Sequence, residues 1–172
     1  MNSETRKKIE EYAKSMRWTP GDFYWKHAFR VREFALMIQK RVGGDKDVTE
    51  ASALLHDVGK AELFAPGHEE ISAKLAEEFL EKIGFDKNRI NNVVDCIKYE
   101  NFELLEARIL RSADSMGLIM DEKGQRWYFE NILKNSKERI LKELEKSYSE
   151  IEFDFAKRFV EKTYKKLVKK YE

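Results

Sequence analysis

The residues most suited to chemistry are His56 and Asp57, which stand side by side at the end of an apolar run, residues 53–55. His27 lies upstream and Asp114 downstream, both in segments that otherwise resemble helices. Two imidazoles and two carboxylates form a mixed nitrogen and oxygen donor set suited to Mn²⁺, Fe, Co²⁺, Ni²⁺ or Zn²⁺. The four residues are therefore candidates for a transition-metal site.

Two helices are predicted to position the first three of these residues. The first opens at residues 19–22 and continues to about residue 42, with apolar positions every three or four residues, so that His27 faces inward with them. The second carries the apolar run inward and ends at Gly59, just after the histidine and aspartate pair. Asp47, with Glu50 three residues later, is interpreted as the capping arrangement of this second helix.

The rest of the chain also has helical patterns. No segment shows a useful length of the period-two alternation of a half-buried strand, so we expect an all-α fold. Asp114 lies at the edge of a buried face, where an unpaired carboxylate is costly and a metal ion would satisfy it. The further predicted helices cover about residues 69–83, 86–99, 105–117, 127–148 and 152–171.

The order His, then His-Asp, then Asp resembles the HD-domain metal-dependent phosphohydrolases. The matching blocks are His27-x-x-Arg30-Val31, the run from Leu54 to Lys60, His68 with the run from Ser72 to Ala76, and the run from Glu106 to Asp114. The resemblance extends from about Trp25 to about Leu118. It implies an HD-type helical bundle with His27, His56, Asp57 and Asp114 as metal ligands.

Two neighbours of these ligands have expected roles in catalysis and in substrate binding. Lys60, three residues after Asp57, can place a positive charge on a phosphate held by the ion, although it could also be an ordinary exposed lysine. In the deoxynucleotidase branch of the family an acidic residue is typical at this position, which argues against a close relationship to that branch. His68 would either contact substrate phosphate or bind a second metal ion bridged by Asp57, with Glu100 as a further ligand. We prefer a mononuclear site with His68 beside the substrate.

Two basic residues, each about one helical turn from a candidate ligand, could bind the substrate. Ser115 stands where many relatives have a basic residue, so a phosphate contact there is in doubt. Arg30 and Arg111 are possible substitutes, and each is equally well explained as part of a structural ion pair. Glu106 lies two helical turns before Asp114 and could orient a ligand histidine through a hydrogen bond.

Composition limits the class of protein. The 172 residues fit one domain, residues 1–172, with a family-like core at about 20–120 and C-terminal helices at about 126–171. The 33 basic and 32 acidic residues nearly cancel, so net charge gives no reason to expect a nucleic-acid partner. Cys96 is the only cysteine, which excludes an intrachain disulfide. We expect a cytoplasmic protein without a membrane partner, and a homo-oligomer remains open.

The expected activity is hydrolysis of a phosphate ester or pyrophosphate of a small molecule by a metal-activated water, with Asp57 also accepting the proton of that water. A nucleotide substrate and an additional use of Mg²⁺ are implied by the resemblance alone. The alternative is a catalytically silent HD-fold module that binds a ligand or regulates a partner. A purely structural bundle would not explain why His56 and Asp57 adjoin.

Overall fold

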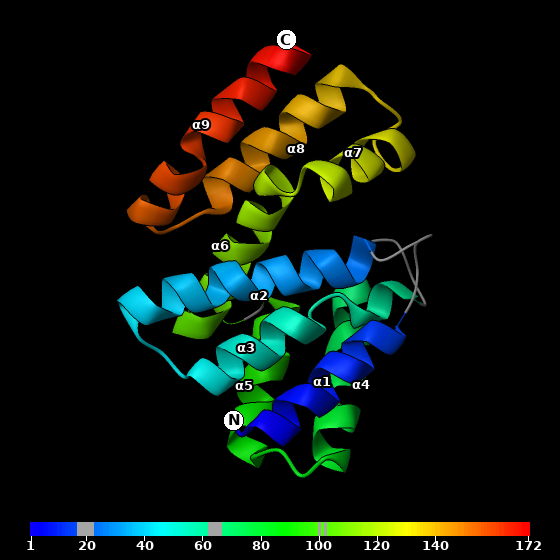
Figure 1. The fold of residues 1–172 in the computed structure, drawn as a ribbon, viewed down its shortest axis with the longest axis vertical. Coiled ribbons are helices and arrows are strands. Elements are labelled where there is room, and N and C mark those ends of the chain that lie inside the picture. The colour runs from blue at the N-terminus through cyan, green and yellow to red at the C-terminus, as the bar shows by residue number, and fades with distance from the viewer. Residues whose placement is uncertain (17–22, 62–66, 100, 102) are drawn as a thin grey trace.

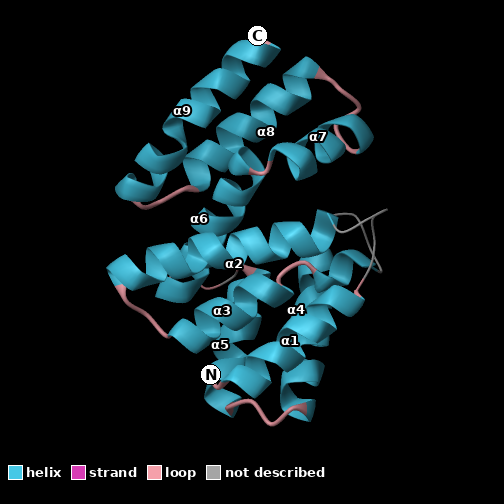
Figure 2. Ribbon diagram, viewed as in Figure 1, coloured by secondary structure: helices cyan, strands magenta, loops and turns pink. Residues whose placement is uncertain are grey.

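A computed structural model describes the chain except for residues 17–22, 62–66, 100 and 102. The described residues form helices and connecting loops without a strand (Figure 2), which confirms the predicted all-α fold. The elements are α1 (Ser3–Ser15), α2 (Phe23–Val42), α3 (Lys46–Leu55), the 3₁₀ helix η1 (Val58–Ala61), α4 (His68–Lys82), α5 (Lys87–Lys98), α6 (Leu105–Met120), α7 (Glu122–Asn131), α8 (Lys137–Glu150) and α9 (Asp154–Tyr171).

The helices form two groups that α2 and α6 join (Figure 1). α2 packs along both α3 and α6, and α4 packs along α5 and against η1. On the other side of α2, α8 packs against α6 and α9. The group that contains α1, α3, α4 and α5 lies on one side of α2 in Figure 1, and α7, α8 and α9 lie on the other. The elements that carry the candidate ligands therefore meet near the centre.

The main hydrophobic core follows this arrangement. It contains fully buried side chains from α2, α3, α5 and α6, including Ile38, Leu54, Ile97 and Ile109. A second, smaller cluster holds α7, α8 and α9 together around Phe129. Among the described residues, no helix combines the length and the apolar character needed to cross a membrane.

The start of α3 differs from the prediction. Asp45, not Asp47, is the capping residue, and its side chain accepts hydrogen bonds from the backbone N–H groups of Asp47 at 2.8 Å and Val48 at 3.3 Å. Gly43 and Gly44 adopt positive φ angles of 88° and 92° after α2. The chain turns there, and Asp45 follows directly as the cap of α3, which begins at Lys46. The predicted pair of Asp47 with Glu50 is therefore wrong as a cap.

The C-terminal helices also differ from the prediction. The expected continuous helix over residues 127–148 is wrong, because α7 ends at Asn131 and α8 begins at Lys137. Lys134 and Asn135 both have φ of 54° in the connection, and Ser136 caps α8 by accepting a hydrogen bond from the Arg139 backbone N–H. The ends of α2 and α9 agree with the prediction, whereas the predicted opening at residues 19–22 lies outside the described residues.

Candidate metal centre

Three candidate ligands meet where α2 faces the end of α3. His27, His56 and Asp57 each offer one ligand atom, and these atoms all lie within 4.8 Å of one another. Asp57 Oδ2 is 3.5 Å from His56 Nε2 and 3.9 Å from His27 Nε2. Ligands that share one ion at about 2.1 Å are roughly 3–4 Å apart, so these three atoms fit around a common metal ion.

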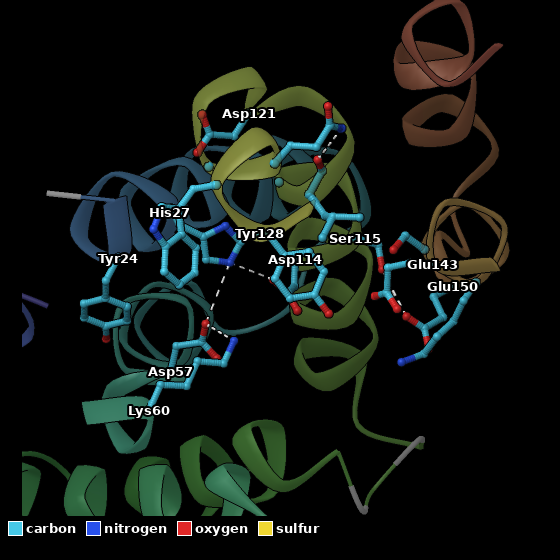
Figure 3. Close-up of a pocket in the computed structure, with 17 residues that line it drawn as sticks. Tyr24, His27, Asp57, Lys60, Asp114, Ser115, Asp121, Tyr128, Glu143 and Glu150 are labelled. Atoms are coloured by element: carbon cyan, nitrogen blue, oxygen red, sulfur yellow. Dashed lines mark hydrogen bonds and ion pairs between the residues drawn. The ribbon is translucent and has the colours of Figure 1, made fainter. Parts of the chain in front are cut away.

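Asp114 joins the group from α6. Its Oδ1 lies 2.9 Å from His27 Nε2 and 3.6 Å from His56 Nε2, and Figure 3 shows its carboxylate beside the imidazole of His27. Burial tends to raise the pKa of this carboxyl group, but the hydrogen bond from His27 and the nearby His56 hold the pKa well below its usual value. Asp114 is thus held as a carboxylate that faces both histidines.

His56 provides the clearest sign that a cation belongs here. Its ring is 2% exposed, and Nδ1 lies 2.9 Å from the carbonyl oxygen of Ala53. Because a carbonyl can only accept, Nδ1 donates and Nε2 of the neutral ring carries the lone pair. This Nε2 is buried and has no hydrogen-bond partner among the described residues. A lone pair fixed in this way and surrounded by two carboxylates and a second imidazole fits a divalent transition metal.

Lys60 and His68 contact opposite oxygens of Asp57. Lys60 Nζ lies 2.6 Å from Oδ2, and His68 Nε2 lies 3.2 Å from Oδ1. Burial tends to raise the pKa of Asp57, but the charges of His56 and Lys60 and the hydrogen bond from His68 hold it well below its usual value. The predicted site residues Asp57, Lys60 and His68 are therefore together, whereas Glu100 lies outside the described residues.

Gly59 has a different role from the predicted helix stop. α3 ends at Leu55, and Gly59 lies within η1, so that prediction is wrong. The Gly59 backbone N–H donates to Ser72 Oγ at 2.9 Å. An added Cβ would lie 2.5 Å from the His68 carbonyl oxygen and 2.6 Å from the Ser72 nitrogen. The absence of a side chain lets η1 contact the start of α4, which brings His68 to Asp57.

Gly117 supports His27 in a similar way and was missed by the sequence analysis as a functional position. An added Cβ would lie 3.0 Å from Val31 Cγ2 and 3.2 Å from His27 Cε1. The available signal was its spacing of three residues from Asp114, which places both residues on neighbouring turns of α6.

Replacing Gly117 by alanine should lower metal affinity about tenfold, as is typical when a residue that positions a metal ligand is changed. The new methyl group must displace the His27 imidazole, because the opposite neighbour Val31 is fully buried. Isothermal titration of the metal-free protein with Mn²⁺ would measure the change. Gly84→Ala is the control, since it adds a methyl group in open space at a φ of 72° and should cost stability without weakening metal binding. Equal affinities of Gly117→Ala and the wild type would contradict this role.

The basic residues considered for substrate binding occupy different places. Arg30 does not line the pocket beside the metal centre. Arg111 Nη2 donates to Glu150 Oε1 at 3.1 Å, and Ser115 Oγ donates to Glu150 Oε2 at 3.3 Å. The structure therefore places Arg111 in an ion pair, which was the alternative interpretation of this residue.

Glu106 does not orient a ligand histidine, and that prediction is wrong. Its Oε1 accepts a hydrogen bond from the backbone N–H of Asp45. Eight helical residues separate it from Asp114, which corresponds to roughly 12 Å along the axis of α6. Glu106 therefore fixes the turn before α3 and lies too far away to reach the metal centre.

A pocket opens directly from the candidate ligands. Its volume is about 180 Å³, which is below the roughly 300–1,000 Å³ typical of sites for drug-sized ligands. His27, Asp57, Lys60 and Asp114 line one end. Residues of α7 and α8 also line the pocket, and Figure 3 shows Glu143 and Glu150 toward the other end. The sequence analysis assigned no role to α7 or α8.

Comparison with known proteins agrees with this geometry. A family model described as the HD domain matches residues 24–118, just over half of the chain. The matched segment contains the four candidate ligands together with Lys60 and His68, and it ends before α7. No curated protein and no solved structure gives a significant match.

Proposed function

Because the chain belongs to the HD-domain family, whose members are mostly metal-dependent hydrolases, we propose that it is a metal-dependent phosphohydrolase. Its substrate is a phosphate ester or pyrophosphate of a small molecule, and nucleotides are the first class to test. The observation that carries this proposal is the buried His56 Nε2, which has no hydrogen-bond partner among the described residues and lies among two carboxylates and the His27 imidazole. This arrangement suits a divalent cation, and the ligand group opens into a pocket that Lys60 also lines.

In this proposal His27, His56, Asp57 and Asp114 hold the metal. The bound cation supplies a Lewis acid that lowers the pKa of water and polarises a phosphoryl group. In this proposal Asp57 also accepts the proton of the attacking water. Lys60 lines the pocket beside Asp57 and stabilises the negative charge that develops on the phosphoryl oxygens.

We further propose a mononuclear site with His68 beside the substrate. His68 Nε2 is within direct hydrogen-bonding distance of Asp57 Oδ1, at 3.2 Å. This contact orients the carboxylate so that Oδ2 faces His27 and His56. The imidazole is 17% exposed, and its Nδ1 lies 3.3 Å from Glu69 Oε2.

The proposed activity predicts hydrolysis of a phosphate ester or pyrophosphate bond that depends on a divalent metal ion. The test is a panel of nucleoside mono-, di- and triphosphates, cyclic nucleotides and an aryl phosphate, each with Mn²⁺, Co²⁺, Ni²⁺ and Mg²⁺. We expect turnover of at least one substrate, loss of activity with a chelator and recovery when the metal is restored. The Asp57→Ala protein prepared in parallel controls for contaminating phosphatases. Metal binding without turnover across the whole panel would instead support the catalytically silent ligand-binding module.

A further inference from the structure

The pocket has a second wall that the HD-domain match does not include. Gln125 and Tyr128 from α7 and Glu143 and Glu150 from α8 line it, and we refer to these four residues as the α7–α8 wall. Figure 3 shows Asp57 and Lys60 toward one end of the pocket and Glu143 and Glu150 toward the other. A phosphate placed at the metal centre would therefore direct the remainder of its molecule toward the α7–α8 wall.

Glu150 is held in position by the protein. Arg111 Nη2 donates to one of its oxygens and Ser115 Oγ donates to the other. Both donors come from α6, the helix that also carries Asp114. The carboxylate of Glu150 is thus fixed relative to the metal centre, and its remaining lone pairs are available as hydrogen-bond acceptors at the pocket.

Glu143 differs from Glu150 because it forms no hydrogen bond or ion pair with the described part of the chain. It is partly buried, and burial raises the pKa of its carboxyl group despite the nearby charge of Lys146. A partly desolvated carboxylate without a partner gains from any ligand that donates a hydrogen bond to it. The Glu143 side chain is therefore an acceptor that the fold leaves for a bound molecule.

The other members of the wall favour the same chemistry. Gln125 uses its amide N–H group to donate to the backbone carbonyl of Leu118 at 3.0 Å, which leaves its oxygen as the available polar atom. Tyr128 adds an aromatic ring that can pack against the C–H face of a sugar. Arg111 and Lys146 offset much of the charge of the two glutamates, so the wall favours neutral hydroxyl donors over a strongly cationic group.

We propose that the α7–α8 wall binds the alcohol part of the substrate, that this part is rich in hydroxyl groups as in a sugar, and that Glu143 is its main acceptor. The inference rests on the proposed phosphohydrolase function for the orientation of the substrate. The preferred substrate class is therefore a phosphate ester of a hydroxylated alcohol.

Binding to the Mn²⁺-loaded protein tests this inference independently of turnover. Ribose 5-phosphate, phenyl phosphate, phosphoethanolamine and inorganic phosphate are titrated by calorimetry into the wild type, Glu143→Ala and Glu145→Ala. Glu145 is the matched control, because it is an exposed glutamate on the same helix that does not line the pocket. We expect Glu143→Ala to weaken ribose 5-phosphate binding about tenfold or more, while its affinity for inorganic phosphate and phenyl phosphate changes less than threefold.

The outcomes separate this inference from the proposed function. Hydrolysis by the wild type with equal affinity of all three proteins for ribose 5-phosphate would overturn the role of Glu143 and leave the function standing. Absence of hydrolysis with the expected affinity pattern would overturn the function and support the binding role of the wall. Tighter binding of phosphoethanolamine than of ribose 5-phosphate would show that the wall selects a cation and would refute the hydroxyl assignment.

Discussion

Replacing His56 or Asp57 by alanine is expected to remove the bound metal ion and, with it, any phosphohydrolase activity. Mutation of a residue that only positions a metal ligand typically lowers metal affinity 10- to 100-fold. Removal of the ligand itself should therefore lower the affinity at least about 100-fold. In the part of the chain that the structure describes, the buried His56 Nε2 has no hydrogen-bond partner, and Asp57 Oδ2 faces both histidines. Elemental analysis of the purified proteins after removal of excess Mn²⁺ measures the loss directly.

A matched control for the aspartate is Asp95→Ala. Asp95 is a partly buried residue of α5 that belongs neither to the pocket nor to the candidate ligand group. The Asp95→Ala protein should retain one metal ion per chain, as the wild type should. Unchanged metal content in both His56→Ala and Asp57→Ala would refute the proposed centre, whatever activity the protein has.

The candidate ligands could be found from the sequence because short-range rules determine most of their placement. Helical periodicity put His27 on the inward face of α2, and the adjacency of His56 and Asp57 needed no structural information. The convergence of these three donor atoms follows from α2 packing along α3. The contact between side chains of α2 and α6, with His27 Nε2 2.9 Å from Asp114 Oδ1, could only be suggested by the resemblance to a known family.

The sequence did not reveal the second wall of the pocket, because that wall depends on how helices cross. Glu143 is part of an ordinary charged helix pattern, and only the packing of α8 on α6 places it in the wall of the pocket. The sequence pattern also did not predict the break between α7 and α8. The two residues with positive φ in this connection are Lys134 and Asn135, and neither is a glycine or a proline. Asn tolerates this conformation, but a lysine there gives no local signal.

Glu50 shows how a correct local pattern led to a wrong role. Its position three residues after Asp47 matches a capping box, yet the side chain is fully buried and serves tertiary structure. Its Oε1 lies 2.8 Å from Arg6 Nε, 2.6 Å from Arg32 Nε and 2.5 Å from Arg32 Nη2. The carboxylate therefore ties α1 and α2 to α3, which a local pattern cannot reveal.

Replacing Glu50 by alanine is accordingly expected to destabilise the fold strongly. Removal of one partner from a buried ion pair costs about 3–5 kcal/mol, and the lower end applies because the Arg6 side chain is 32% exposed. A loss of about 3 kcal/mol corresponds to a decrease in melting temperature of roughly 6–12 °C for a chain of this size. Thermal and urea unfolding followed by circular dichroism would measure both quantities.

Glu10→Ala is the control, because Glu10 also faces Arg32 but only at 4.0 Å and with 26% exposure. This replacement should therefore lower the free energy of unfolding by less than about 1 kcal/mol. Similar stabilities of the two variants would show that the two arginines do not hold α1 and α2 to α3 through Glu50.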